Sequence, residues 1–128
     1  MNLLGIDFED WFHPELIQKS LKSEKKEPTV VNGIEKILDW LRKNDTFATF
    51  FVVGELLEFK PDLLDKIIGN GHEIGFHTMD HTRLDAPNFK EKFDEQLKQF
   101  ARLTNGKSKG FRAPSFSLGY STAWALDV

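Results

Sequence analysis

The sequence predicts an α/β fold in which short parallel strands alternate with helices, as in the N-terminal part of a (β/α) barrel. Apolar runs of strand length alternate with segments of helical periodicity along the chain. Four strand–helix units of about 30 residues account for the 128 residues, whereas a complete eight-unit barrel takes about 250 residues. Acidic, imidazole and guanidinium groups directly follow predicted strands, where parallel α/β folds collect their functional groups.

The composition fits one globular domain covering residues 1–128. Hydrophobic residues make up 40% of the chain, and the net charge is −3 without a basic cluster, which argues against disorder and against a nucleic-acid partner. The chain has no Cys, so any metal must be held by His, Asp or Glu. No apolar run approaches the roughly 20 residues of a membrane span, and no secretory signal is evident, so we expect a cytoplasmic protein.

The first predicted unit covers the N-terminal part of the chain. Leu3 to Phe8 is a short apolar run that ends on the carboxylates of Glu9 and Asp10, as a buried strand would. A polar, lysine-rich segment from Gln18 to Glu27 predicts a solvated loop. A helix should follow, because apolar side chains recur at helical spacing at positions 34, 37, 38 and 41.

The second unit begins at an uncharged, aromatic and β-branched segment. Phe47 to Val53 predicts a strand whose aromatic residues, Phe47 to Phe51, lie in the core. Pro61 is typical of a first helical turn and opens a helix with apolar side chains at positions 63, 64, 67 and 68. Gly69 and Gly71 predict the end of this helix.

Two further units follow the same pattern. Glu73 to Phe76 predicts a strand that leads directly into His77. Asn88 to about Thr104 predicts an amphipathic helix, and Lys109 to Arg112 a fourth strand. Ser121 to Val128 begins a helix that has no terminal cap, so we expect the chain to be truncated within its domain.

His77 and His81 are candidate metal ligands. Their four-residue spacing would place both imidazoles on one face of a helical turn, where they can bind one metal ion. A chance pair of polar residues near a loop would explain the spacing equally well in a chain with four His. Their position directly after a buried strand favours a site.

Three carboxylates lie at the end of the first predicted strand. Because side chains alternate along a strand, Asp7 and Glu9 would share one face while Asp10 points to the other, unless the backbone turns first. Asp10 could instead cap a turn, and Arg112, at the end of the fourth predicted strand, could pair at the surface. The gathering of these groups at three strand ends favours a site over these structural roles.

Such a set of groups suits hydrolysis. A divalent ion with three protein ligands and an open position lowers the pKa of its bound water to about 7. Asp7, held by the cation of Arg112, could then take the proton from that water as it attacks a carbonyl group.

Four segments together resemble the polysaccharide deacetylase family, which carries the NodB homology domain and forms carbohydrate esterase family four. They are GIDFEDW at residues 5–11, ATFFV at 48–52, GHEIGFHTMDH at 71–81 and GFRAPSFS at 110–117. The HTxxH and RxP segments are jointly specific for the family. The first and last segments most resemble the branch associated with bacterial exopolysaccharide and surface-glycan synthesis.

The resemblance implies a distorted (β/α) barrel, a divalent ion, most commonly Zn²⁺, and removal of N-acetyl groups from amino sugars of a glycan. Asp7 matches the family's catalytic base, and Arg112 matches the arginine that orients it. His77 and His81 match metal ligands. Ser115 falls where the family uses a backbone N–H, together with the metal, to stabilise an oxyanion.

Two features depart from the family pattern. The family commonly has adjacent aspartates, base then ligand, whereas this chain reads Asp7-Phe8-Glu9-Asp10. The third metal ligand is therefore Glu9, which strand alternation favours, or Asp10, which residue type favours. The family's general-acid His has no counterpart in this sequence. An isolated chain would then lack activity, and open barrel edges would favour homo-oligomers.

Two other functions are compatible with these residues. One is hydrolysis of a small amide, as in allantoinase-like relatives of the same fold, and the other is a non-catalytic glycan-binding module. The intact Asp7, His77, His81 and Arg112 argue against the binding module. The favoured prediction is a hydrolase of carbon–nitrogen bonds other than peptide bonds, acting on an N-acetylated glycan.

Overall fold

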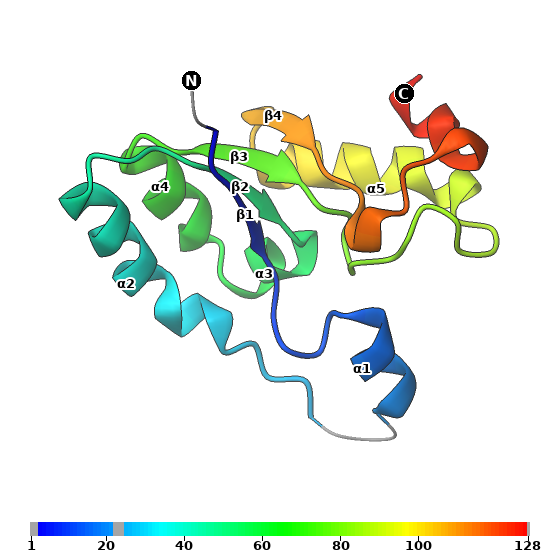
Figure 1. The fold of residues 1–128 in the computed structure, drawn as a ribbon, viewed down its shortest axis with the longest axis horizontal. Helices are drawn as coiled ribbons and strands as arrows, with labels where there is room; N and C mark the ends of the chain where they lie inside the picture. The colour runs from blue at the N-terminus through cyan, green and yellow to red at the C-terminus, as the bar shows by residue number, and fades with distance from the viewer. Residues whose placement is uncertain (1–2, 22–24, 128) are drawn as a thin grey trace.

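The chain forms a four-stranded parallel sheet, and helices connect each strand to the next along the chain (Figure 1). The computed structural model describes residues 3–21 and 25–127. The strand order is β1-β2-β3-β4, which is also the order along the chain. The strand bounds are Gly5–Phe8 for β1, Thr49–Val52 for β2, Glu73–Phe76 for β3 and Ser108–Phe111 for β4. The predicted α/β class, with its four parallel strands, is confirmed.

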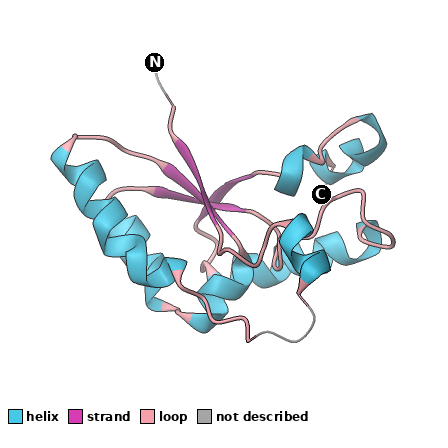
Figure 2. Cartoon of the chain, turned by 60° about the horizontal axis from the view of Figure 1, so that its bottom comes forward, coloured by secondary structure: helices cyan, strands magenta, loops and turns pink. Residues whose placement is uncertain are grey.

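The long helices lie together on one side of the strands (Figure 2). The helices are α1 (Glu15–Ser20), α2 (Val30–Lys43), α3 (Gly54–Phe59), α4 (Asp62–Gly69) and α5 (Lys90–Leu103). Two 3₁₀ segments follow β4, namely η1 (Pro114–Phe116) and η2 (Tyr120–Leu126). None of the helices in the described ranges has the length and apolar character needed to cross a membrane.

The core lies between the sheet and these helices. Alternate strand residues point into it and are almost fully buried, and these are Phe8, Phe50, Val52, Ile74 and Phe76. The apolar stripes of α2 and α4, which the helical spacing predicted, pack against them through residues such as Ile34, Leu38, Leu63 and Ile67. Burial of one sheet face against helices is what fixes the strand register.

The opposite face of the sheet carries the polar groups. Asp7 and Phe51 pair in register on β1 and β2, and both point away from the core. The side chain of Arg112 lies over the ring of Phe51, with its guanidinium carbon 4.1 Å from the ring centroid. A hollow of about 600 Å³ lies on this face, lined by Gly5, Phe51, Arg112 and their neighbours. The site is built along the edge of this open face.

Several local predictions differ from the structure. Phe47, expected in the core, is 66% exposed because β2 begins two residues later, at Thr49. The short helix α3 was not predicted, since it follows β2 with a single intervening residue and has only six residues. The expected loop from Gln18 to Glu27 begins inside α1, and residues 22–24 lie outside the described residues. The predicted C-terminal helix is 3₁₀, and its last residue, Val128, is also outside them.

Candidate metal centre

His77 and His81 lie in the loop that follows β3, with ring centroids 5.0 Å apart. They do not share a helical turn, contrary to the spacing argument. Thr78 and His81 instead have φ angles of 57° and 61°, so the backbone turns sharply between the two imidazoles. Both rings are buried. A turn with positive φ angles, rather than a helical turn, brings the two imidazoles together.

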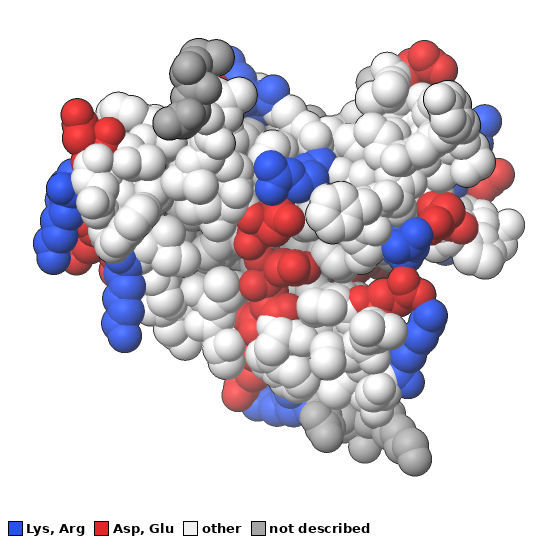
Figure 3. All heavy atoms as spheres, in the orientation of Figure 1, with Lys and Arg blue, Asp and Glu red and all other residues white. Residues whose placement is uncertain are grey.

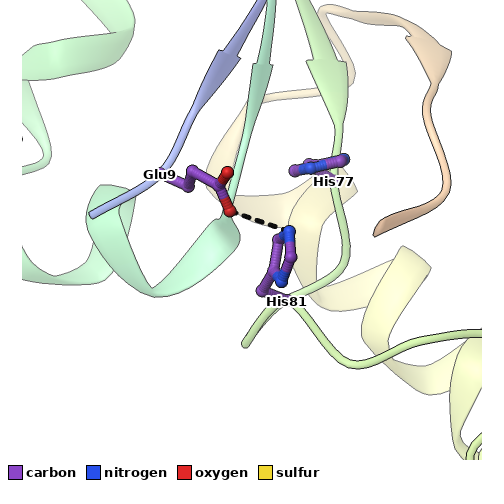
Figure 4. A group of neighbouring side chains, drawn as sticks. All are labelled: Glu9, His77 and His81. Atoms are coloured by element: carbon purple, nitrogen blue, oxygen red, sulfur yellow. Dashed lines mark ion pairs between the residues drawn. The ribbon is translucent and has the colours of Figure 1, made fainter. Parts of the chain in front are cut away.

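Glu9 completes a group of three potential ligands (Figure 4). One atom from each of Glu9, His77 and His81 lies within 4.8 Å of the other two. Glu9 follows the last residue of β1, and its Oε2 is 2.7 Å from Nε2 of His81. The carboxyl ends of β1 and β3 thus deliver the three side chains to one point. One carboxylate and two imidazoles form a donor set typical of catalytic Zn²⁺ sites.

Asp10 does not join this group, because its side chain caps the start of α2. Its carboxylate accepts hydrogen bonds from the backbone N–H of Val30 at 2.8 Å, from the N–H of Thr29 and from the N–H of Trp11. Burial opposes ionisation of Asp10, but these hydrogen bonds outweigh it and hold its pKa below the ordinary value. Of the two alternative carboxylates, Glu9 therefore faces the imidazoles.

The group fits a metal ion. Oε2 of Glu9 is buried and makes no well-formed hydrogen bond to any described residue, although Nε2 of His81 is only 2.7 Å away. Nδ1 of His77 donates to the backbone carbonyl of Arg112 at 2.7 Å, which leaves the lone pair of Nε2 available. A buried carboxylate oxygen without a partner is costly, and a cation bound at this group would satisfy it.

The charge states also suit a cation. Burial disfavours the charged form of Glu9, but the close contact with His81 outweighs it and holds the pKa of Glu9 below its ordinary value. Burial lowers the pKa of His77, so its ring is neutral at neutral pH. A carboxylate and a neutral imidazole are the forms that bind metal.

Asp7 and Arg112 form an ion pair beside this group. Nη1 of Arg112 lies 2.5 Å from Oδ1 of Asp7, and both side chains are half exposed. Arg112 follows β4, and its backbone N–H bonds the carbonyl of Phe76 at 2.9 Å. Gly5 leaves the room that the guanidinium occupies, since a Cβ there would lie 2.2 Å from Nη2 of Arg112.

Ser115 lies on the same side as this ion pair. A hollow of about 560 Å³ is lined by Asp7, Arg112 and Ser115 together with the exposed ring of Phe116. Ser115 has a φ of 51°, and Nη1 of Arg83 donates to its carbonyl at 3.0 Å. The structure therefore brings Asp7, Arg112 and Ser115 to one hollow.

His13 and Glu55, to which the sequence analysis gave no role, form a contact close to the metal ligands. His13 is 1% exposed, and its Nε2 lies 2.5 Å from Oε1 of Glu55. They are 42 positions apart in the sequence and share no motif, so no sequence signal could have paired them.

Acidic side chains gather across the middle of this face of the molecule, next to a basic group (Figure 3). Such a concentration of negative charge attracts cations, and this attraction weakens as the salt concentration rises.

Comparisons with known proteins give the family and the fold of the chain. The family model for polysaccharide deacetylase matches residues 18–126. A peptidoglycan-N-acetylglucosamine deacetylase of Bacillus cereus is 40% identical over 97 residues, covering 72% of this chain and 35% of that protein. The crystal structure of a peptidoglycan N-acetylglucosamine deacetylase matches with a TM-score of 0.69 and 25% identity, covering 98% of this chain and 51% of that one.

A solved pseudoenzyme of Bacillus anthracis, described as of the CE4 family, shares the fold with a TM-score of 0.71 at 22% identity, over 98% of this chain and 40% of that one. The matched part of the chain amounts to 27–36% of the length of curated relatives. The family match covers most of the chain, and the predicted motifs lie within the fold that the relatives share. The chain belongs to the polysaccharide deacetylase family.

Proposed function

We propose that the protein is a metal-dependent deacetylase that hydrolyses N-acetyl groups on the amino sugars of a glycan. The observation that carries this proposal is the meeting of Glu9, His77 and His81 at one edge of the sheet, with the pair Asp7 and Arg112 beside them. Ligands for one ion and a separate carboxylate base are the two components that metal-assisted amide hydrolysis needs.

Glu9, His77 and His81 would hold the ion, with Zn²⁺ favoured by the mixed oxygen and nitrogen donors. When bound, the ion supplies Lewis-acid polarisation of the acetyl carbonyl and a lowered pKa for the attacking water. The hydrogen bond from His77 to the Arg112 carbonyl fixes which ring nitrogen faces the ion.

Asp7 is the proposed general base. It lies on the open face of the sheet, where its carboxylate can accept the proton of the attacking water. The guanidinium of Arg112 orients this carboxylate and stabilises its charge. The oxygen of water adds to the acetyl carbon while one of its protons passes to Asp7. As the carbon–nitrogen bond breaks, this proton is transferred to the nitrogen, so the products are acetate and an amine.

The backbone N–H of Ser115 is the proposed donor to the oxyanion that forms on the acetyl oxygen. Ser115 lines the same hollow as Asp7, and its backbone is turned by a positive φ. Donors fixed before the reaction stabilise developing charge without reorganisation.

The proposed substrate is a polymer of N-acetylated amino sugars. The B. cereus relative carries the name of a deacetylase of peptidoglycan N-acetylglucosamine, and the motifs at residues 5–11 and 110–117 favour an exopolysaccharide or other surface glycan. The exposed ring of Phe116 beside the hollow is suited to contact the apolar face of a sugar.

The proposal is tested by measuring bound metal and acetate release from N-acetylglucosamine oligomers, with the protein as its gene encodes it. About one Zn²⁺ per chain and release of acetate are expected. His77→Ala should remove both. Full Zn²⁺ affinity in His77→Ala would disprove the ligand assignment, and bound metal with no acetate from any oligomer would disprove the substrate class.

A further inference from the structure

We propose that His13 and Glu55 are positioning residues that hold Glu9 in place opposite the two imidazoles. This inference rests on the proposed metal site, and it assigns a role to two residues that do not contact the ion. A continuous set of hydrogen bonds runs from the segment that carries Glu9 to the segment that carries His77 and His81.

The ring of His13 closes the turn that follows Glu9. The backbone N–H of Asp10 donates to Nδ1 of His13 at 2.6 Å, and the backbone N–H of His13 donates to the carbonyl of Asp10 at 3.0 Å. The turn is thus closed both by backbone and by the imidazole. Because the first of these donors belongs to the residue after Glu9, the ring fixes the direction in which the chain leaves β1.

Asp10 is held on its other side as well. Its side chain caps α2 through Val30 and Thr29. The peptide between Glu9 and Asp10 is therefore fixed from two sides, by the ring of His13 and by the start of a 14-residue helix. Glu9 has little freedom to turn away from His81.

Glu55 connects this turn to the opposite loop. Nε2 of His13 lies 2.5 Å from Oε1 of Glu55, in the first turn of α3. The backbone N–H of Glu55 donates to the carbonyl of Met79 at 2.9 Å, and the N–H of Gly54 donates to that of Thr78 at 3.0 Å. Thr78 and Met79 lie between the two metal-binding histidines. One path therefore joins both sides of the site.

The tautomer of His13 follows from these contacts. Nδ1 accepts a hydrogen bond, so the ring proton is on Nε2, where it is donated to the Glu55 carboxylate. A histidine that merely filled space would not need both nitrogens engaged. Here Nδ1 contacts the backbone of Asp10 and Nε2 contacts Glu55, so the rigid ring fixes the distance between these two segments.

Zn²⁺ affinity, measured by competition with a chelator, tests the role. His13→Phe keeps a ring but removes both contacts, and Glu55→Leu removes one. Each should weaken binding about 10-fold or more, as loss of an orienting partner does elsewhere. Glu55→Gln should retain near-normal affinity, because its amide oxygen still accepts the Nε2 proton. The double variant His13→Phe with Glu55→Leu should be no weaker than His13→Phe alone.

Glu58→Ala is the matched control, since Glu58 is on the same helix but bonds Gln99 at the surface. It should leave affinity unchanged. The visible spectrum of bound Co²⁺ gives a second readout, because it reports ligand geometry. It should change in His13→Phe and Glu55→Leu but not in Glu58→Ala. Glu55 is 41% exposed, so Glu55→Leu keeps the test open if His13→Phe fails to fold.

The outcomes separate the two proposals. If the unmodified chain binds Zn²⁺ and both His13→Phe and Glu55→Leu bind it equally well, the positioning role is wrong and the metal site stands. If the unmodified chain binds no Zn²⁺, the metal site is wrong and the positioning role fails with it. Nitrogen NMR of the metal-free chain should show the proton of His13 on Nε2, and a proton on Nδ1 would overturn the positioning role independently of metal.

Discussion

The backbone carbonyl of Arg112 accepts a hydrogen bond from Nδ1 of His77 at 2.7 Å. The side chain of the same arginine pairs with Asp7 at 2.5 Å. One residue after β4 therefore orients a proposed metal ligand with its backbone and the proposed base with its guanidinium. The ligand and the base are coupled because β1, β3 and β4 end at the same edge of the sheet.

Replacing Asp7 by Asn should separate binding from chemistry. Asn keeps the shape of the side chain but cannot accept the proton of water, so we expect acetate release to fall about 100-fold or more. Zn²⁺ affinity should remain near that of the unmodified protein, because Asp7 is not among the three grouped ligands. The check is turnover and metal titration on the same samples, and undiminished turnover would remove Asp7 from the role of base.

Glu9 and Asp10 should respond differently to substitution, although they are neighbours. Glu9→Gln should weaken Zn²⁺ binding by more than the roughly 10–100-fold typical of an outer partner, since it removes a charged ligand. Asp10→Ala should lower the free energy of unfolding by about 1 kcal/mol through loss of the helix cap, while one Zn²⁺ per chain still binds. Loss of metal stoichiometry in Asp10→Ala with normal binding by Glu9→Gln would reverse the assignment.

Gly5→Ala should disturb the proposed base through Arg112. Its Cβ would lie 2.2 Å from Nη2 of Arg112, and the flexible guanidinium is the group that can move. Misplacement of this kind should reduce turnover roughly 10- to 100-fold with little change in Zn²⁺ affinity. Gly33→Ala, in α2 with no atom within 4 Å of the new Cβ, is the control. It should keep full turnover and gain up to about 1 kcal/mol of stability, and equal turnover in the two variants would contradict the prediction.

The stability of the fold should fall on mild acidification because of His72. Burial lowers the pKa of this imidazole below its ordinary value of 6.5, and Nδ1 accepts the backbone N–H of Ala48 at 3.3 Å. In the unfolded chain the ring takes up a proton near pH 6.5, whereas in the folded chain it stays neutral to lower pH. The unfolded state thus binds more protons, so stability decreases as pH falls below this value.

Urea unfolding at about pH 7.5 and about pH 5 checks this, with His72→Asn as the comparison. The amide oxygen of Asn can still accept the Ala48 N–H but does not titrate. Because the other histidines are present in both proteins, their effects cancel in the difference. The unmodified protein should lose more stability than His72→Asn, and an equal loss would show that His72 does not cause the pH dependence.

Periodicity predicted most of the elements. Strand β3 has the predicted bounds, Glu73 to Phe76. The glycines before this short run and the polar loop after it leave little choice of where the strand begins and ends. The helix from Val30 to Lys43 was also found from its apolar spacing. Phe47 was misplaced because a run of aromatic residues does not reveal where strand pairing begins. That depends on the neighbouring strands.

The sequence by itself determined the alternation of strands and helices, the family motifs and the residue types that gather at the strand ends. Only the tertiary structure decided that Glu9 faces the imidazoles while Asp10 caps α2, because the choice depends on where the backbone turns after β1. The tertiary structure also decided that His13 contacts Glu55. Local patterns encode which side chains point the same way within one element, whereas contacts between distant segments arise only when the packed sheet brings their ends together.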